Sequence, residues 1–314
     1  MKTEKIETLH VSVGFTCNNS CFFCMESNKK LRYDTVKKFI SSDHMYREMD
    51  KHRNVKKIGF GRGEPTLNPD LPKYIAYAKK KGFLEIAVIS NGRQYKDKEF
   101  CRKLIESGVT EFIVSLHGHT KEIHEVLTRG KDSFLETTQG LKNLSELRHQ
   151  FKFRIVISHV VTKVNYRFIG NFLKLMRNFT ISEILLGVVR PYNCGGMKKF
   201  FFALMPKYSE VAKEIDQLFE KNAKLFFSKE DANKKYVIIN DIPACSSKKL
   251  VELIGIRREW VSGNDIKGEE YADGLPRLKS IKCQKCLYEK MCGGIFESYI
   301  NHYGWDEFTP VVKK

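Results

Sequence analysis

Residues 11–24 read VSVGFTCNNSCFFC, so a short apolar run leads directly into three closely spaced cysteines. The run from Val11 to Thr16 is predicted to form a buried strand. The loop after it carries Cys17, Cys21 and Cys24, with three and then two residues between them. Three thiolates on one tight loop can hold a metal centre, but they leave a four-ligand site incomplete. The stretch therefore predicts a strand followed by a metal site with one open coordination position, where chemistry can take place.

Outward from this loop, residues 11–191 alternate apolar runs with amphipathic segments. The runs are rich in Ile and Val, as expected for parallel strands that are buried on both faces. They are Val11–Thr16, Lys57–Phe60, Glu85–Ser90, Glu111–Leu116, Phe153–Val161 and Glu183–Val189. The helices predicted between them are Asp34–His52, Leu71–Lys81, Lys96–Ser107, Ser133–Arg148 and Asn165–Phe179. Because no GxGxxG turn follows the first strand, this α/β pattern predicts a partial parallel barrel rather than a doubly wound sheet.

Polar motifs share one position in this pattern, since each lies at the carboxyl end of a predicted strand. They are the cysteine loop, Gly61-Arg62-Gly63-Glu64-Pro65, Ser90-Asn91-Gly92, Ser115-Leu116-His117-Gly118 and Arg190-Pro191-Tyr192. Parallel barrels build their active sites at this face, so the motifs are predicted to meet there. Glycines let the backbone approach a ligand closely, and the carboxylate of Glu64 suits an ammonium group.

The composition favours a globular chain with acidic partners. With 42% hydrophobic residues, the 314 residues can bury a sizeable core, as one large domain with an appendage or as two domains. The formal charge of +18 is compatible with nucleic acid, phosphorylated metabolites or an acidic peptide, but the lysines are spread along the chain, which favours a lysine-rich solvated surface. No apolar run reaches transmembrane length and no signal peptide is recognisable, so no membrane partner and a cytoplasmic location are expected.

A second group of cysteines lies near the end of the sequence, where Cys283, Cys286 and Cys292 are separated by two and then five residues. In a reducing compartment such groups indicate metal sites rather than disulfides. Cys245, on a proline-containing turn after a predicted strand (Tyr236–Ile242), is the leading candidate for a fourth ligand. A zinc ribbon is the alternative to an iron–sulfur site here. Cys101, in a predicted helix, is expected to be a buried small hydrophobe.

The spacing Cys17-x3-Cys21-x2-Cys24, with the aromatic Phe23 before the third cysteine, resembles the signature of the radical S-adenosylmethionine (SAM) superfamily. A structural zinc knuckle and three unrelated core cysteines are the alternatives. The resemblance implies a partial (β/α)6 barrel and a 4Fe–4S cluster on the three thiolates. It also implies that SAM binds the fourth iron and is cleaved reductively to methionine and a 5′-deoxyadenosyl radical, which abstracts a substrate hydrogen.

Further motifs carry the same resemblance. Gly61, Gly63, Glu64 and Pro65 are similar to the family's Gly-Gly-Glu-Pro element, which binds the methionine amino group, although Arg62 stands where many members have glycine. Residues 90–92 resemble its Thr-Asn-Gly element, which makes Ser90 and Asn91 candidate cofactor contacts, and Ser115 is a weaker candidate for a ribose contact.

The C-terminal cysteines and Cys245 resemble the auxiliary-cluster domain called twitch, a smaller form of the SPASM domain. This implies a second 4Fe–4S cluster. The expected division is 1–195 for the barrel, 196–235 for a helical connection and 236–314 for the auxiliary domain. Cys194-Gly195-Gly196 is predicted to form a turn, and residues 246–282 match no recognisable pattern.

Other side chains have open roles. His117, near His119 and His124, is a candidate for substrate contact or proton transfer, with capping of the next helix as the alternative. Cys245 or Cys194 could instead donate a hydrogen atom to a substrate radical.

The most favoured function is a peptide-modifying radical SAM enzyme, or maturase, reduced by a flavodoxin or ferredoxin. A carbohydrate or small-metabolite epimerase or dehydrogenase is close behind, and an RNA-modifying enzyme is supported only by charge. A non-catalytic zinc protein is the alternative from a different class.

Overall fold

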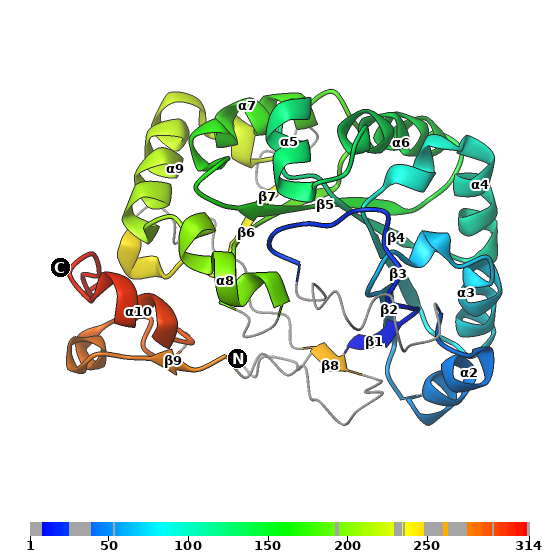
Figure 1. Ribbon diagram of the computed structural model, residues 1–314, viewed down its shortest axis with the longest axis horizontal. Helices are drawn as coiled ribbons and strands as arrows, with labels where there is room; N and C mark the ends of the chain where they lie inside the picture. Colours follow the sequence, from blue (N-terminus) through cyan, green and yellow to red (C-terminus); the bar gives the residue numbers. More distant parts are fainter. Residues whose placement is uncertain are drawn as a thin grey trace.

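A computed structural model gives the fold, and it describes residues 8–24, 39–52, 54–191, 195–228, 234, 236–247, 260–262, 275–290 and 292–312. Its frame is an eight-stranded sheet in the order β7-β6-β5-β4-β3-β2-β1-β8, in which every pairing is parallel (Figure 1). The strands are β1 (Thr8–Ser12), β2 (Lys57–Gly61), β3 (Glu85–Ser90), β4 (Glu111–Ser115), β5 (Arg154–Val161), β6 (Glu183–Val188), β7 (Val237–Asn240) and β8 (Trp260–Ser262). The fold class predicted from the sequence, a parallel α/β partial barrel, is confirmed.

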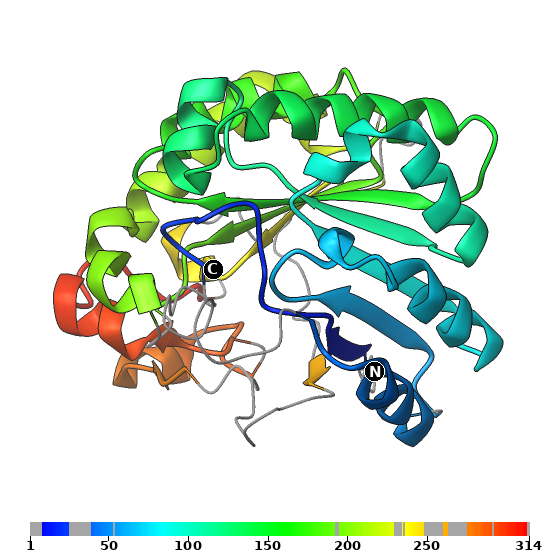
Figure 2. The same ribbon diagram turned by 45° about the vertical axis from the view of Figure 1, so that its right-hand side comes forward.

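Helices cover the outer side of the curved sheet, and the segment after β1 crosses its inner side (Figures 1 and 2). The α-helices are α2 (Ser42–Lys51), α3 (Leu71–Lys80), α4 (Lys98–Ser107), α5 (Lys121–Thr128), α6 (Ser133–Leu147), α7 (Ile169–Met176), α8 (Gly195–Leu204), α9 (Tyr208–Asn222) and α10 (Glu297–Tyr303). Shorter 3₁₀ turns are η1 (Pro65–Leu67), η2 (Arg93–Lys96), η3 (Tyr166–Phe168), η4 (Ala223–Phe226), η5 (Ala244–Ser246) and η7 (Ile281–Lys285).

Local sequence explains where α2 begins and where α4 begins and ends. The side chain of Asp97 caps α4 by accepting from the backbone N–H groups of Glu99 and Phe100, and the helix stops at Gly108, whose φ is 124°. The Ser41 side chain accepts from His44 N at the start of α2. This helix therefore begins later than the predicted segment 34–52, of which residues 34–38 lie outside the described part.

The sequence prediction contains no helix at the positions of α5 and α8. The sequence predicts a turn at Gly195-Gly196, but these residues begin α8, so that prediction is wrong. Tertiary packing overrides the two glycines, because the ring of Phe200 on α8 packs edge-on against Phe22 at 5.2 Å. Helix α5 is the other addition, and its last carbonyl groups are used by the cysteine loop.

The C-terminal third both extends the sheet and builds a small appendage. β7 pairs with β6, and β8 pairs with β1, so the sheet continues beyond the predicted six strands at both edges. β9 (Arg277–Leu278) and β10 (Ile295–Phe296) form a separate antiparallel pair. Tyr208 N donates to the Tyr299 hydroxyl at 2.9 Å, which ties α10 to α9.

The sequence-based division into three segments stays a prediction, although strands from 236–314 belong to the main sheet. No helix in the described ranges is both long and apolar enough to cross a bilayer.

Candidate functional site

The cysteine loop lies at the carboxyl end of β1, as the sequence predicts. Cys17, Cys21 and Cys24 are partly exposed and form no disulfide. Two N–H groups point at the Cys17 sulfur, from the backbone of Asn19 at 3.4 Å and from the side-chain amide of Asn91 at 3.8 Å. Such donors stabilise a thiolate and are typical around iron–sulfur ligands. The donor set of the loop therefore fits a cluster held by three thiolates.

Helix α5 supports the loop through its last turn. Ser20 N donates to Thr128 O at 2.9 Å, and Phe22 N donates to Leu127 O at 3.1 Å. The last four carbonyl groups of a helix lack partners within the helix, so the loop satisfies groups that would otherwise need water. The ring of Phe23 lies edge-on to the ring of His117, with their centroids 4.8 Å apart.

The Gly61–Pro65 motif connects two strand ends through Glu64, a residue that is 2% exposed. Its Oε1 accepts from Thr66 N (3.1 Å), Thr66 Oγ1 (2.6 Å) and Ser90 Oγ (2.7 Å). Its Oε2 accepts from Asn91 N at 2.7 Å. Burial raises the pKa of Glu64, and the hydrogen bonds from Thr66, Asn91 and Ser90 act in the opposite direction. The carboxylate thus joins the end of β2 to the end of β3.

The two residues before Glu64 have left-handed backbone conformations, with φ of 61° at Arg62 and 56° at Gly63. A Cβ on Gly63 would lie 2.7 Å from Thr16 O and 2.8 Å from Gly14 O. Glu64 N also donates to Thr16 O at 2.7 Å. The turn after β2 is therefore packed directly on the backbone that leads into Cys17, which is why glycine is needed at position 63.

The variant Gly63→Ala should perturb the cysteine loop specifically. Its left-handed backbone and the overlap with Thr16 should together lower the free energy of unfolding by about 2–4 kcal/mol. The fraction of protein that binds iron at the loop should fall as well. Gly82→Ala is a matched control, because Gly82 has φ of 91° but no atom within 4 Å of its Cβ position. Equal iron content in both variants, measured after anaerobic reconstitution, would contradict this account.

The Ser90–Gly92 motif joins the same network. Asn91 donates through Nδ2 to Asn18 Oδ1 at 2.6 Å and accepts from Arg93 N at 3.0 Å. Gly92 has φ of 77°, and a Cβ there would lie 2.7 Å from a methyl group of Val114. The predicted meeting of the first three motifs at one end of the sheet is confirmed. Pro65 is buried at the start of η1, and Ser115 is half-buried at the end of β4.

His117 is buried and held by backbone groups. Its Nδ1 accepts from Val160 N at 3.1 Å, and its own backbone N donates to His124 Nδ1 at 3.1 Å. Burial lowers the pKa of His117 well below its usual value, so the ring is neutral with its proton on Nε2. The structure gives the ring a role in joining the ends of β4 and β5, and its catalytic role stays a prediction.

Two further buried histidines make the fold sensitive to acid. Burial lowers the pKa of His124 to about 3 and that of His159 to about 4. The unfolded chain therefore takes up protons first as the pH falls. The contribution of these two histidines to the free energy of unfolding should be constant above about pH 6.5. It should decrease as the pH falls, down to about pH 4 for His159 and about pH 3 for His124, by at most about 1.4 kcal/mol per pH unit for each histidine.

Denaturant titrations of His159→Asn across this pH range should show a shallower decrease. The variant loses packing against Phe172, whose ring centroid is 4.0 Å away, so the slope is compared rather than the absolute stability. His149→Gln, at an exposed position, serves as the control and should keep the wild-type slope. An unchanged slope in His159→Asn would show that this histidine is not the titrating group.

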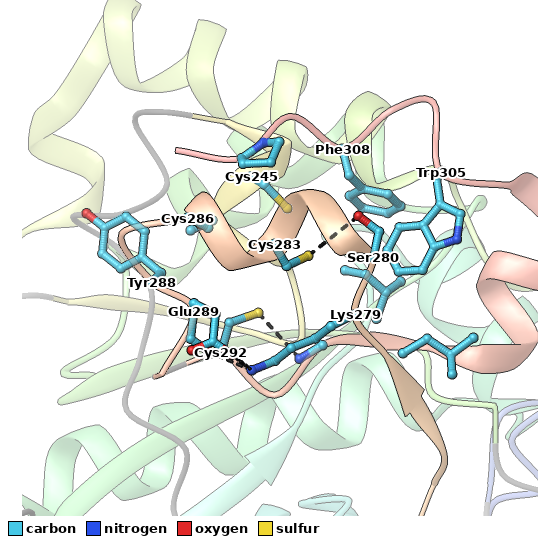
Figure 3. Close-up of a pocket in the computed structure, with 15 residues that line it drawn as sticks. Cys245, Lys279, Ser280, Cys283, Cys286, Tyr288, Glu289, Cys292, Trp305 and Phe308 are labelled. Carbon is cyan, nitrogen blue, oxygen red and sulfur yellow. Dashed lines mark hydrogen bonds and ion pairs between the residues drawn. The ribbon is translucent and has the colours of Figure 1, made fainter. Parts of the chain in front are cut away.

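A second site lies in the C-terminal appendage, where Cys245, Cys283, Cys286 and Cys292 line one pocket (Figure 3). Gly294 N donates to Cys292 Sγ at 3.4 Å, and Ser280 Oγ lies 3.9 Å from Cys283 Sγ. Burial raises the pKa of Cys245 to about 12, and the neighbouring thiols of the other three cysteines add to this increase. The fourth cysteine that the sequence proposes is thus brought to the trio.

The four cysteines reach the pocket from separate segments, Cys245 after β7 and the other three between β9 and β10. Across the ranges that the structure describes, no three Cys, His, Asp or Glu side chains are placed to hold a single metal ion. Tetrahedral zinc would need all four sulfurs about 2.3 Å from one centre. A 4Fe–4S cube instead accepts each sulfur on a different iron atom, so its ligands stand farther apart. The wall of the pocket is otherwise largely apolar, including Trp305 and Phe308.

An ion-pair network that the sequence analysis missed links this pocket to the barrel. Asp241, just after β7, pairs with Arg190 Nε at 2.7 Å and with Arg277 Nη2 at 3.2 Å. Arg277 also lies over the ring of Phe296 at 3.9 Å. Asp241 falls inside the predicted strand Tyr236–Ile242, so no local pattern marked it as part of a site. Cys101 is buried, as expected, and Cys194 lies outside the described residues.

Comparisons with known proteins agree with this geometry. A family model described as the radical SAM superfamily matches residues 11–172, which is more than half of the chain. A probable GTP 3′,8-cyclase of Saccharolobus islandicus (strain Y.N.15.51) is 27% identical over 235 residues, covering 74% of this chain and 71% of that protein. The corresponding protein of Saccharolobus solfataricus is 26% identical over 235 residues, with the same coverage.

Solved structures share the fold at low sequence identity. Streptococcus suis SuiB bound to the precursor peptide SuiA gives a TM-score of 0.65 at 15% identity, covering 98% of this chain and 75% of that chain. Native anSMEcpe with bound AdoMet gives 0.60 at 14% identity, covering 91% and 87%. The matched family model, the cysteine loop and the parallel sheet lead to one conclusion: the chain belongs to the radical SAM superfamily and is a radical SAM enzyme.

Proposed function

We propose that this radical SAM enzyme carries two iron–sulfur clusters and modifies a peptide. Membership of the family implies a 4Fe–4S cluster and SAM. In the proposal, Cys17, Cys21 and Cys24 hold that cluster and leave one iron for SAM. The bound and reduced pair supplies a 5′-deoxyadenosyl radical, which takes a hydrogen atom from the substrate.

The SAM contacts proposed for this chain lie around the cysteine loop. Backbone groups of Gly61 and Gly63, next to Glu64 and Pro65, would face the methionine moiety, and Ser90 and Asn91 would hold the neighbouring strand end in place. The hydrogen bonds of Glu64 support a positioning function, because they link the turn after β2 to that after β3. Phe23 and Ser115 are proposed to contact the nucleoside part.

The second cluster is proposed for Cys245, Cys283, Cys286 and Cys292 in a twitch-like appendage, within a segment spanning 236–314. The single observation that carries this proposal is that all four thiols line one pocket. Four protein ligands would leave no iron open to substrate, which suits transfer of an electron from the substrate radical better than binding of the substrate. In this arrangement Cys245 acts as a ligand rather than as a hydrogen-atom donor.

Cys245→Ala tests this assignment. The variant should lose most of the second cluster, so that iron content after anaerobic reconstitution falls from about eight towards about four per chain. SAM cleavage without substrate should continue, because the cysteine loop is untouched. Cys101→Ala is the matched control, since Cys101 is buried in α4 away from both cysteine groups. Full iron content in Cys245→Ala would instead favour the hydrogen-donor role.

A peptide substrate is supported by the breadth of the structural likeness. SuiB, whose structure with a precursor peptide is known, aligns with nearly the whole chain, including the appendage. The strongly positive net charge of +18 fits an acidic peptide. An epimerase or dehydrogenase of a small metabolite would use the same two clusters. It is therefore the main alternative to a peptide-modifying enzyme among radical SAM enzymes with two clusters.

A nucleotide substrate is the second candidate, favoured by a different observation. The curated relatives at 27% identity bear the name GTP 3′,8-cyclase, and a nucleoside triphosphate is also strongly acidic. The experiment compares 5′-deoxyadenosine formation by the reduced enzyme with no addition, with GTP and with short acidic peptides encoded beside the gene. The proposal predicts that a peptide accelerates the reaction and gains a changed mass. Consumption of GTP without any effect of a peptide would replace the peptide proposal by the nucleotide one.

A further inference from the structure

Arg93 begins η2, outside every motif that the sequence singles out, and its guanidinium lies beside the cysteine loop. Nη1 donates to Asn18 O at 2.6 Å and to Asn19 Oδ1 at 3.0 Å. Nη2 donates to Lys131 O at 3.0 Å, and Nε pairs with Glu136. Only 14% of the side chain is exposed. One guanidinium therefore binds three separate segments of the chain.

Two of these acceptors belong to the residues next to Cys17. Asn18 and Asn19 follow it directly, and Asn19 N donates to the Cys17 sulfur at 3.4 Å. The side chain of Asn19 is 6% exposed, so its contact with Arg93 is shielded from water. Arg93 thus binds the carbonyl of Asn18 and the side-chain amide of Asn19, the two residues that follow Cys17.

The connection between α5 and α6 confines the loop from the other side. A Cβ on Gly130 would lie 2.2 Å from Asn19 Oδ1 and 3.1 Å from Arg93 Nη1. The preceding residue, Arg129, has φ of 53° and places its guanidinium 5.1 Å from the Phe22 ring centroid. The loop is thus held between η2 and the carboxyl end of α5.

We propose that Arg93 is a positioning residue that gives the cysteine loop its ligand-binding shape before any cluster is present. The inference rests on the proposed role of Cys17, Cys21 and Cys24. With these hydrogen bonds made during folding, the loop loses little further conformational freedom when the cluster binds. A planar guanidinium suits the task, because its donors point in fixed and different directions, whereas an ammonium is a point charge.

The test compares the full-length chain with Arg93→Met, Arg93→Lys, Gly130→Ala and a control, each reconstituted anaerobically. Release of iron to a chelator is followed together with the electron paramagnetic resonance (EPR) signals of the reduced clusters. Arg93→Met should lose the SAM-sensitive cluster about ten times faster or more, as is typical when a residue that orients a metal ligand is removed. The second cluster should be released at the wild-type rate, which provides an internal control within each sample.

Arg154→Met is the matched control. Arg154 pairs with Glu111 at 2.7 Å and Glu183 at 3.0 Å at the beginning of their strands, the end of the sheet opposite the cysteine loop. Its loss should lower the melting temperature without changing the rate of iron release from either cluster.

Arg93→Lys should resemble Arg93→Met more than wild type. Gly130→Ala should also accelerate iron release from the SAM-sensitive cluster, although it removes no charge. This variant keeps the inference testable if Arg93→Met folds poorly.

Three results would overturn the inference. Arg93→Met and Gly130→Ala could both keep the SAM-sensitive cluster at the wild-type rate, or both clusters could be released faster in proportion to a lower melting temperature. Wild-type protein that binds no iron at the cysteine loop would overturn the proposed function, and with it this inference.

Discussion

Replacing Cys17, Cys21 and Cys24 together with alanine should abolish SAM cleavage and leave a folded protein with about four irons. The three side chains are partly exposed and lie on a loop, so their removal costs little packing. The second group of cysteines is built from other segments and should keep its cluster. The measurement is iron content combined with 5′-deoxyadenosine formation after reduction.

The complementary variant makes this prediction sharper. Replacing Cys283, Cys286 and Cys292 with alanine should also leave about four irons, but SAM should still be cleaved. The two variants would then have equal iron content and opposite activity. If the variant without Cys17, Cys21 and Cys24 still formed 5′-deoxyadenosine, the placement of radical chemistry at the N-terminal loop would be wrong.

Glu64→Gln should be the most damaging single substitution outside the cysteines. Every group that contacts the carboxylate is a donor, from Thr66, Ser90 and the backbone of Asn91. The glutamine NH₂ would face one of these donors, leaving a buried N–H or O–H without an acceptor at a cost of about 1–3 kcal/mol. Because Asn91 also contacts Asn18 and Cys17, we expect SAM affinity to fall about tenfold or more.

Glu48→Gln is the control for this prediction. Glu48 is also buried, at 7% exposure, but it pairs with Lys51 on α2, away from the cysteine loop. Both variants should lower the melting temperature, and only Glu64→Gln should weaken SAM binding, measured by the SAM-induced change in the EPR signal of the reduced cluster. Wild-type SAM affinity in Glu64→Gln would contradict a positioning role for this carboxylate.

The sequence predicts the sheet well because its strands are apolar on both faces and are separated by amphipathic helices. The end of α4 is predicted because Gly108 can adopt the φ of 124° at which the helix stops. β1 ends earlier than predicted, because Val13 to Thr16 leave the sheet and the carbonyl groups of Gly14 and Thr16 lie against the turn after β2. β7 and β8 are short, and their membership of the sheet depends on long-range pairing that leaves no local pattern.

The candidate site likewise has a part that the sequence predicts and a part that only the fold reveals. Its motifs are recognisable because glycine, cysteine and asparagine occur at strand ends, and the first three motifs meet as expected. Arg93 has no such signal, because it reaches Asn18 across 75 residues of sequence and only the fold brings them together. The ion pair of Asp241 and Arg277, which are 36 residues apart, likewise leaves no pattern in the local sequence. His117 lies where the sequence places it, but its Nδ1 is bound to the backbone of Val160, which no local pattern could reveal.

The central claim is that two cysteine groups of this chain hold iron–sulfur clusters and that the first directs the cleavage of SAM. The most direct test is the anaerobically reconstituted wild-type protein, in which metal content and SAM products are measured together after reduction. The account predicts about eight irons per chain and formation of 5′-deoxyadenosine with an equal amount of methionine. A colourless protein that contains zinc and leaves SAM intact would contradict it.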